Sequence, residues 1–102
     1  MIIDKKAFKN SKLRSFWESD CKNNSGLPPD LLSRIRMLLV HLDSARSLED
    51  IAEGLGKIRD FHKLKGVKNR YALSANGNYR ITFDCGSPNT GVVDKIDFED
   101  YH

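Results

Sequence analysis

Residues 71–83, Tyr71-Ala72-Leu73-Ser74-Ala75-Asn76-Gly77-Asn78-Tyr79-Arg80-Ile81-Thr82-Phe83, predict a β-hairpin and decide the fold. Two runs with alternating apolar and polar residues flank the dipeptide Asn76-Gly77, which is typical of tight hairpin turns. A hairpin of this kind requires an antiparallel sheet in the second half of the chain.

The register of this hairpin can be predicted from the way in which each register sorts apolar and polar side chains onto the two faces of the sheet. A two-residue loop would place Tyr71 on the same face as Arg80. A three-residue loop over residues 75–77, with Gly77 left-handed, pairs Ser74 with Asn78 and gathers all the large apolar side chains on one face. Since a slip of one residue reverses a whole strand, we expect the three-residue loop, with Arg80 exposed on the polar face.

The remaining segments complete an α+β domain. Residues 84–91 are expected to form a longer turn and residues 92–98 the last strand, whereas residues 62–66 lie where an earlier strand ends. Before them, the spacing of apolar residues predicts helices over about 5–21, from Pro28 to about Asp43, and over 47–54. The apolar face of the second helix comprises Leu31, Leu32, Ile35, Leu38, Leu39 and Leu42. With 102 residues, the chain is expected to form one domain over 1–102.

The charge of the chain is concentrated in one segment. The formal net charge is only +3, but residues 57–80 contain seven basic side chains and a single acidic one. Residues 81–102 contain one basic and five acidic side chains. Such a basic segment is typical of proteins that bind phosphate groups, although a solvated basic loop would have the same composition.

The composition argues against several classes of protein. No apolar run approaches the roughly 20 residues that cross a bilayer, and the N-terminus is charged from Asp4 onward, so we expect a cytoplasmic protein without a membrane contact. The two cysteines, Cys21 and Cys85, lack the short spacing of zinc ligands. Without an export signal they are expected to be reduced thiols rather than a disulfide, and no cofactor or metal is expected.

Three polar clusters occur in a characteristic order: His62-Lys63-Leu64-Lys65-Gly66, Gly77-Asn78-Tyr79-Arg80-Ile81-Thr82-Phe83 and Glu99-Asp100-Tyr101-His102. Together they resemble the HigB group of bacterial toxin–antitoxin killer proteins, within the RelE/ParE toxin superfamily. The sequence departs from this pattern at Lys63, where relatives often have proline, at Tyr71, where tryptophan is common, and in the longer 84–91 turn.

The resemblance implies a RelE-like fold that enters the A site of the 70S ribosome and cleaves mRNA there. It also implies a cognate helix-turn-helix antitoxin as a partner. The residues that would line the catalytic site are His62, Lys65, Arg80, Asp100, Tyr101 and His102. The basic segment would add RNA contacts from Lys57, Arg59, Lys63, Lys68 and Arg70.

These residue types suit cleavage of RNA without a metal, in which the ribose 2′-hydroxyl attacks the adjacent phosphorus. A histidine can accept or donate the proton near neutral pH. The planar guanidinium of Arg80 matches two phosphate oxygens, and Lys65 adds a point charge. Tyr101 can stack on a base. Whether His62, His102 or Asp100 acts as the base remains open at this point.

Two other functions remain possible from the sequence. A toxin of the same fold could poison gyrase by protein contact, and the basic segment could belong to a nucleic-acid-binding module without catalysis. The presence of His62, Lys65, Arg80 and Tyr101 favours the ribonuclease, because neither alternative needs an acid–base set.

Overall fold

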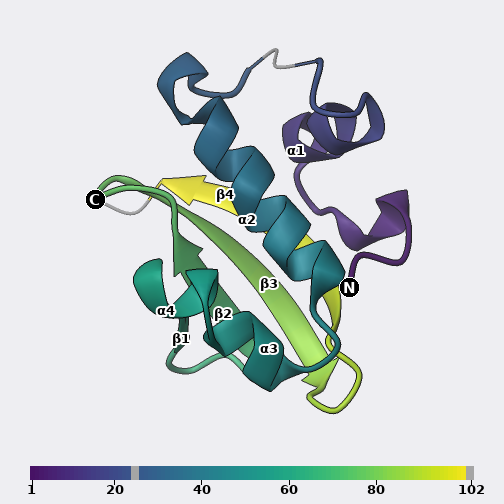
Figure 1. Ribbon diagram of the computed structural model, residues 1–102, viewed down its shortest axis with the longest axis vertical. Coiled ribbons are helices and arrows are strands. Elements are labelled where there is room, and N and C mark those ends of the chain that lie inside the picture. Colours follow the sequence, from purple (N-terminus) through teal and green to yellow (C-terminus); the bar gives the residue numbers. More distant parts are fainter. Residues whose placement is uncertain (24–25, 101–102) are drawn as a thin grey trace.

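The helices precede the strands, as the sequence predicts, in a computed structural model that describes residues 1–23 and 26–100. Two short 3-10 helices, η1 and η2, cover Lys5–Ala7 and Pro29–Leu31. The α-helices are α1 (Ser11–Glu18), α2 (Leu32–Ser44), α3 (Leu48–Ala52) and α4 (Leu55–Ile58). The strands are β1 (His62–Lys63), β2 (Arg70–Ser74), β3 (Tyr79–Ser87) and β4 (Val92–Asp100) (Figure 1). The α+β class is confirmed.

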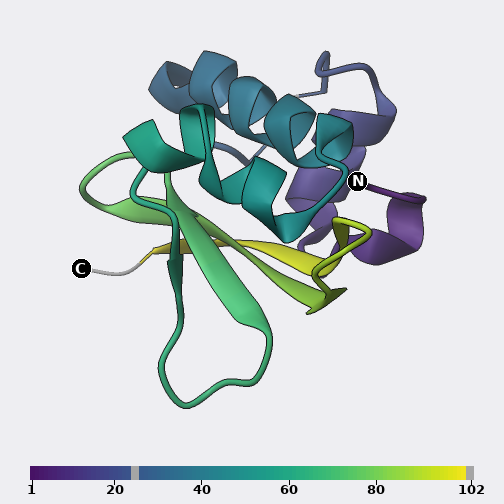
Figure 2. The same ribbon diagram turned by 60° about the horizontal axis from the view of Figure 1, so that its bottom comes forward.

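The four strands form one antiparallel sheet in the order β1-β2-β3-β4. Helices α2, α3 and α4 lie over one face of this sheet, and none of the helices within residues 1–23 and 26–100 covers the opposite face (Figure 2). The N-terminal segment runs parallel to β4, with bridges from Ile2 to Val93 and from Phe8 to Ile96. The N-terminal segment thus pairs with part of the outer edge of β4. This pairing limits the tendency of β4 to pair with a strand of another chain.

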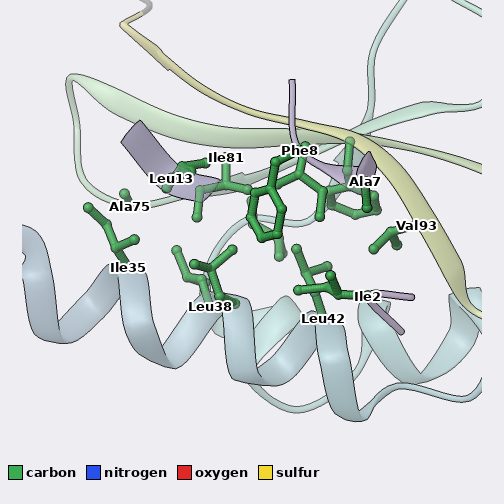
Figure 3. Packing of buried hydrophobic residues seen from close by; sticks show 14 of the residues in the cluster. Ile2, Ala7, Phe8, Leu13, Ile35, Leu38, Leu42, Ala75, Ile81 and Val93 are labelled. Atoms are coloured by element: carbon green, nitrogen blue, oxygen red, sulfur yellow. The ribbon is translucent and has the colours of Figure 1, made fainter. Parts of the chain in front are cut away.

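The core lies between α2 and the sheet (Figure 3). The side chains of Ile35, Leu38 and Leu42 point from α2 toward the strands, where they meet buried residues such as Ile81 and Val93. The apolar spacing that predicts this helix therefore identifies the face that folding buries. Leu32 differs from the others, because it is only partly buried at the beginning of the helix.

The hairpin confirms the predicted faces but not the predicted loop. Leu73 pairs with Ile81 and Ser74 with Arg80, and the loop between β2 and β3 spans residues 75–78 rather than 75–77. Relative to the predicted pairing of Ser74 with Asn78, the register is shifted by two residues. A shift of two residues keeps every side chain on its predicted face. The prediction that Gly77 is left-handed is wrong: the side chain of Asn76 instead accepts the N–H groups of Asn78 and Tyr79, both at 2.8 Å.

The first predicted helix is divided in two. Phe8 leaves the helical path to bridge Ile96, and the N–H groups of Lys9 and Asn10 both donate to the Ile96 carbonyl. The Asn10 side chain then caps α1 by accepting the N–H groups of Lys12 and Leu13. Pairing with β4 therefore prevails over the local helical pattern.

Two further differences concern the second half of the chain. Strand β3 continues to Ser87, so the turn predicted over residues 84–91 is reduced to residues 88–91. Register shifts after Thr82 and Asp84 accommodate this extension. Helix α4 is not predicted, because its four residues are too few to establish a period.

Both cysteines are free thiols, as expected from the sequence. Cys85 is fully buried in the core, whereas Cys21 is partly exposed. Burial raises the pKa of the Cys85 thiol above its ordinary value, so the thiol stays protonated and unreactive in the folded chain.

Two close contacts join α3 to its neighbours, one to α2 and one to α4. The His41 ring, which extends from α2, bonds through Nε2 to the Ile51 carbonyl at 2.8 Å. Gly56 packs so closely on α3 that a β-carbon there would lie 1.8 Å from the same carbonyl oxygen. Glycine is therefore required for α4 to occupy its position.

The variant Gly56→Ala is expected to lose about 1–3 kcal/mol of unfolding free energy, because the added methyl group overpacks the contact with Ile51. Urea denaturation measures this loss. The control is Gly86→Ala, where a β-carbon meets nothing within 4 Å. Equal stability of the two variants would contradict the close packing of α3 and α4.

Candidate active site

The face of the sheet opposite the helices carries two of the side chains predicted from the sequence to be catalytic, His62 and Arg80. Residues that face each other in antiparallel strands project to the same side. The register therefore places two rows on this face, one with His62, Thr82 and Asp97 and one with Arg80 and Glu99. We call this surface the polar sheet face.

His62 and Arg80 lie on the polar sheet face in strands that are separated only by β2. Two strand spacings and an offset of two residues along the strands correspond to about 12 Å between the backbones of His62 and Arg80. Between them β2 contributes the small residues Ala72 and Ser74. Ala72 is fully buried, so longer neighbouring side chains close over it.

The imidazole of His62 has a defined orientation. Its Nδ1 lies 2.8 Å from the Asp60 carbonyl oxygen and 3.8 Å from the Asp60 carboxylate. A carbonyl can only accept a hydrogen bond, so Nδ1 carries the hydrogen in the neutral ring and Nε2 keeps the lone pair. Since the side chain is 43% exposed, the ring is suited to take a proton from a bound molecule.

Arg80 is half-buried, and its Nε is inaccessible to solvent. The expectation that this side chain is simply exposed is therefore wrong, although its placement on the polar sheet face is confirmed. The difference arises because Arg80 occupies β3, a central strand, where Ser74 of β2 and Glu99 of β4 stand opposite it on the two sides.

Arg70, on the neighbouring strand β2, is the centre of a hydrogen-bonded network. Its guanidinium donates to the Asp84 carboxylate and to Thr82 Oγ1, both at 2.8 Å, and to the Lys95 carbonyl at 3.1 Å. The hydroxyl of Thr82 donates in turn to the carboxylate of Glu99, which lies 3.9 Å from Arg70. This network fixes Glu99 directly opposite Arg80.

The placement of Arg70 argues against its predicted role as an RNA contact. Its side chain is only 12% exposed, and both terminal nitrogens donate hydrogen bonds to other residues of the chain.

Glu99 was not among the predicted site residues. The pairing of adjacent strands is needed to see that this carboxylate, rather than that of Asp100, lies beside Arg80.

Asp100 lies apart from His62 and Arg80. The register pairs it with Tyr79, which belongs to the opposite side of β3, and the Tyr79 ring stacks on Phe98 with centroids 5.1 Å apart. Asp100 lines a hollow there together with Lys12 and other residues. The other two predicted residues of this cluster, Tyr101 and His102, lie outside the residues that the structure describes.

Two of the four lysines of the predicted basic segment lie on the loop between β1 and β2. Lys65 and Lys68 are exposed there and line a hollow of about 560 Å³, together with Lys63. The loop begins with a hydrogen bond from the Leu64 N–H to the Arg70 carbonyl at 2.9 Å. Lys65 is thus close in sequence to His62, on a loop that lines this hollow.

The beginning of the basic segment belongs to the helical layer instead. Lys57 is exposed on α4, and Arg59 donates to the Ala75 carbonyl at 3.4 Å. These two predicted RNA contacts are therefore separated from the polar sheet face. The basic segment divides between the two layers of the domain.

A basic groove beside the polar sheet face combines residues from distant parts of the chain. It has a volume of about 490 Å³ and includes Lys6, Lys9 and Lys95 around Val67 and Phe8. None of these lysines was predicted as a site residue, since they are scattered in the sequence. The parallel pairing of the N-terminal segment with β4 brings them together.

Comparison with known protein families gives a match over nearly the whole chain. Residues 6–102 match the HigB-like toxin family, which is described as RelE-like toxin of the type II toxin–antitoxin system HigB. No curated protein matches the sequence. Within residues 1–23 and 26–100, no helix has both the length and the apolar character to span a membrane.

Proposed function

Because the chain belongs to the HigB-like toxin family, the RelE-like toxins of type II toxin–antitoxin systems, we propose that it is a ribosome-dependent endoribonuclease. The toxin enters the A site of the 70S ribosome, cleaves the mRNA under translation and arrests growth. A cognate helix-turn-helix antitoxin holds it inactive.

The observation that best supports this proposal is the common face of His62 and Arg80. A proton acceptor and a planar cation lie on one side of the sheet, about 12 Å apart at the backbone, within reach of a single phosphodiester through their side chains. No helix of the described residues lies over this face, which leaves room for a strand of RNA (Figure 2).

In the proposed reaction, Nε2 of His62 takes the proton from the ribose 2′-hydroxyl. The 2′-oxygen attacks phosphorus, the bond from phosphorus to the 5′-oxygen breaks, and a 2′,3′-cyclic phosphate remains. The guanidinium of Arg80 stabilises the negative charge that develops on the phosphate oxygens, and Lys65 adds a further positive charge.

The departing 5′-oxygen needs a proton. The family resemblance offers Asp100, Tyr101 and His102 for this role, and the register places Asp100 on the Tyr79 side of the sheet, away from His62 and Arg80. The RNA on either side of the cleaved bond would contact Lys63, Lys65 and Lys68 on the loop and the basic groove at Lys6, Lys9 and Lys95.

The ribosome is required because this domain has little surface with which to orient RNA unaided. Correct positioning of reacting groups can lower a barrier by about 7–11 kcal/mol. A ribosome that holds mRNA in the A site supplies that positioning. Purified protein should accordingly cleave naked RNA poorly.

Expression of the chain without its antitoxin is expected to stop translation and growth, with new mRNA 5′ ends confined to translated regions. Inducible expression and mapping of 5′ ends measure both effects. The variant His62→Ala should remain soluble and lose the cuts, because the proton acceptor is absent.

Cuts that are equally frequent in untranslated RNA would contradict the requirement for the ribosome. Growth arrest with broken DNA and intact mRNA would instead identify a gyrase poison. Normal growth with soluble protein present would contradict the toxic activity itself.

A further inference from the structure

A second surface lies on the helical layer, away from the polar sheet face. Helices α2 and α4 enclose a groove of about 300 Å³, lined by Arg34, Met37, Leu38, Leu55, Ile58 and Arg59. Two of its apolar side chains are unusually exposed, Ile58 at 70% and Met37 at 53%. A large aliphatic side chain in water costs free energy that a binding partner can recover.

Two arginines from different elements meet at one edge of this groove. Arg34, on α2, donates to the Ala75 carbonyl at 2.8 Å, and Arg59, after α4, donates to the same oxygen at 3.4 Å. Sharing one acceptor holds the two guanidinium groups side by side. Among the described residues, no carboxylate lies within 4.0 Å of either group. Their mutual repulsion favours an anion from outside the chain.

We propose that this groove is the docking site of the antitoxin. The bound segment is an amphipathic helix that places apolar side chains between Met37 and Ile58 and a carboxylate on the arginine pair. Grooves between two helices bind such segments through residues spaced three and four apart. The inference rests on the toxin–antitoxin part of the proposed function and is independent of RNA cleavage.

Other occupants fit this surface less well. A second copy docked symmetrically would bring two more arginines to the same edge, without a carboxylate to pair with them. Nucleic acid would pair with Arg34 and Arg59, but it would leave Ile58 and Met37 against a charged backbone. A protein segment with both apolar and acidic side chains can cover Met37 and Ile58 and also pair with the two arginines.

Docking at this groove has a consequence for inhibition. Helices α2 and α4 lie on one side of the sheet and the polar sheet face on the other (Figure 2). The antitoxin therefore need not cover His62 or Arg80, and it would inhibit by adding bulk that prevents entry into the A site. The complex should retain an uncovered polar sheet face.

The test measures affinity for the purified cognate antitoxin by calorimetry. Ile58→Asp and Met37→Asp should each weaken binding at least about tenfold, because they remove apolar contacts and repel the acidic segment. The matched control is Ile3→Asp, which changes an equally exposed aliphatic residue, 61% exposed, outside the groove and should bind normally. Circular dichroism and thermal melting verify the fold of each variant.

A second pair of variants tests the charge. Arg34→Gln should weaken binding and reduce its dependence on salt, whereas Arg36→Gln, an exposed arginine of α2 that does not line the groove, should change little. In cells, Ile58→Asp should arrest growth like the wild type but escape neutralisation by the antitoxin.

Three outcomes would overturn the proposal. Equal antitoxin affinity of Ile58→Asp and Ile3→Asp would exclude the groove as the docking site. Loss of affinity for a short single-stranded RNA instead of the antitoxin would identify a nucleic-acid surface. Dissociation of a wild-type dimer by Ile58→Asp, seen by sedimentation, would identify an interface between copies of the chain. A toxin that lacks ribonuclease activity would leave the binding results unchanged.

Discussion

Replacement of Arg80 by alanine is expected to lower the single-turnover cleavage rate on ribosome-bound mRNA by about 100- to 1000-fold, the usual effect of removing one donor that stabilises transition-state charge. The Arg80 side chain lies on the polar sheet face, as does the side chain of His62. Its planar fork can hold two phosphate oxygens at once.

The partial burial of Arg80 requires a control for folding. Because its Nε is inaccessible to solvent, Arg80→Ala should also lose about 1 kcal/mol of stability. Arg80→Lys keeps the charge and most of the stem but not the fork, so it should fold well and remain impaired. Lys65→Ala should impair cleavage less, since a mobile lysine is a less constrained partner.

The matched control for Arg80 is Arg36→Ala on α2, which should melt and cleave like the wild type. A normal rate in a normally folded Arg80→Ala variant would refute its contact with the transition state. An equal loss of rate in Arg36→Ala would indicate a general effect of charge.

Arg70→Ala is expected to have the largest effect on stability, a loss of about 2–3 kcal/mol. Breaking a fully buried ion pair typically costs about 3–5 kcal/mol. The cost is smaller here because Asp84 and Glu99 keep 26% and 35% of their side-chain exposure. The variant leaves both carboxylates, and the Thr82 hydroxyl, without the cation that holds them together.

Urea denaturation measures this loss, and Lys68→Ala on the neighbouring loop is the control that should be neutral. In the double variant Arg70→Ala/Asp84→Asn, the two losses should be less than additive, because the second change removes a carboxylate that has lost its partner. Unchanged stability of Arg70→Ala with weakened RNA binding would restore Arg70 as an RNA contact, as the sequence alone predicts.

The faces of the hairpin could be predicted because they depend on a period of two. A register shift of two residues leaves Tyr71, Leu73, Ile81 and Phe83 together, so an error in the loop length did not change the side of Arg80. The loop itself could not be predicted, since it depends on the bonds of the Asn76 side chain rather than on Gly77.

Features that depend on contacts between distant segments escape sequence reasoning. The break between η1 and α1 arises from pairing of Phe8 with Ile96, 88 positions away in the sequence. The helical spacing around these residues carries no sign of that pairing. The division of one expected helix is a tertiary effect.

The candidate site shows the same limit. The segments with His62 and Arg80 could be recognised locally, as could the cluster that ends in Asp100. Which of these side chains share a face depends on the registers of β1 and β4, which place Glu99 rather than Asp100 beside Arg80. Likewise, Arg70 has the composition of an RNA contact, but its neighbours in the sheet occupy it.

The position of β4 at the end of the sheet has a consequence for the order of synthesis. Glu99 completes the network of Arg70 and Thr82, and β4 supplies the neighbouring strand on one side of Arg80. While a chain is being made, β1, β2 and β3 emerge before residues 92–100, and domains fold as units once their segments are available. The polar sheet face is therefore incomplete until β4 has left the ribosome, so the surface proposed to bind RNA forms only after synthesis of all four strands.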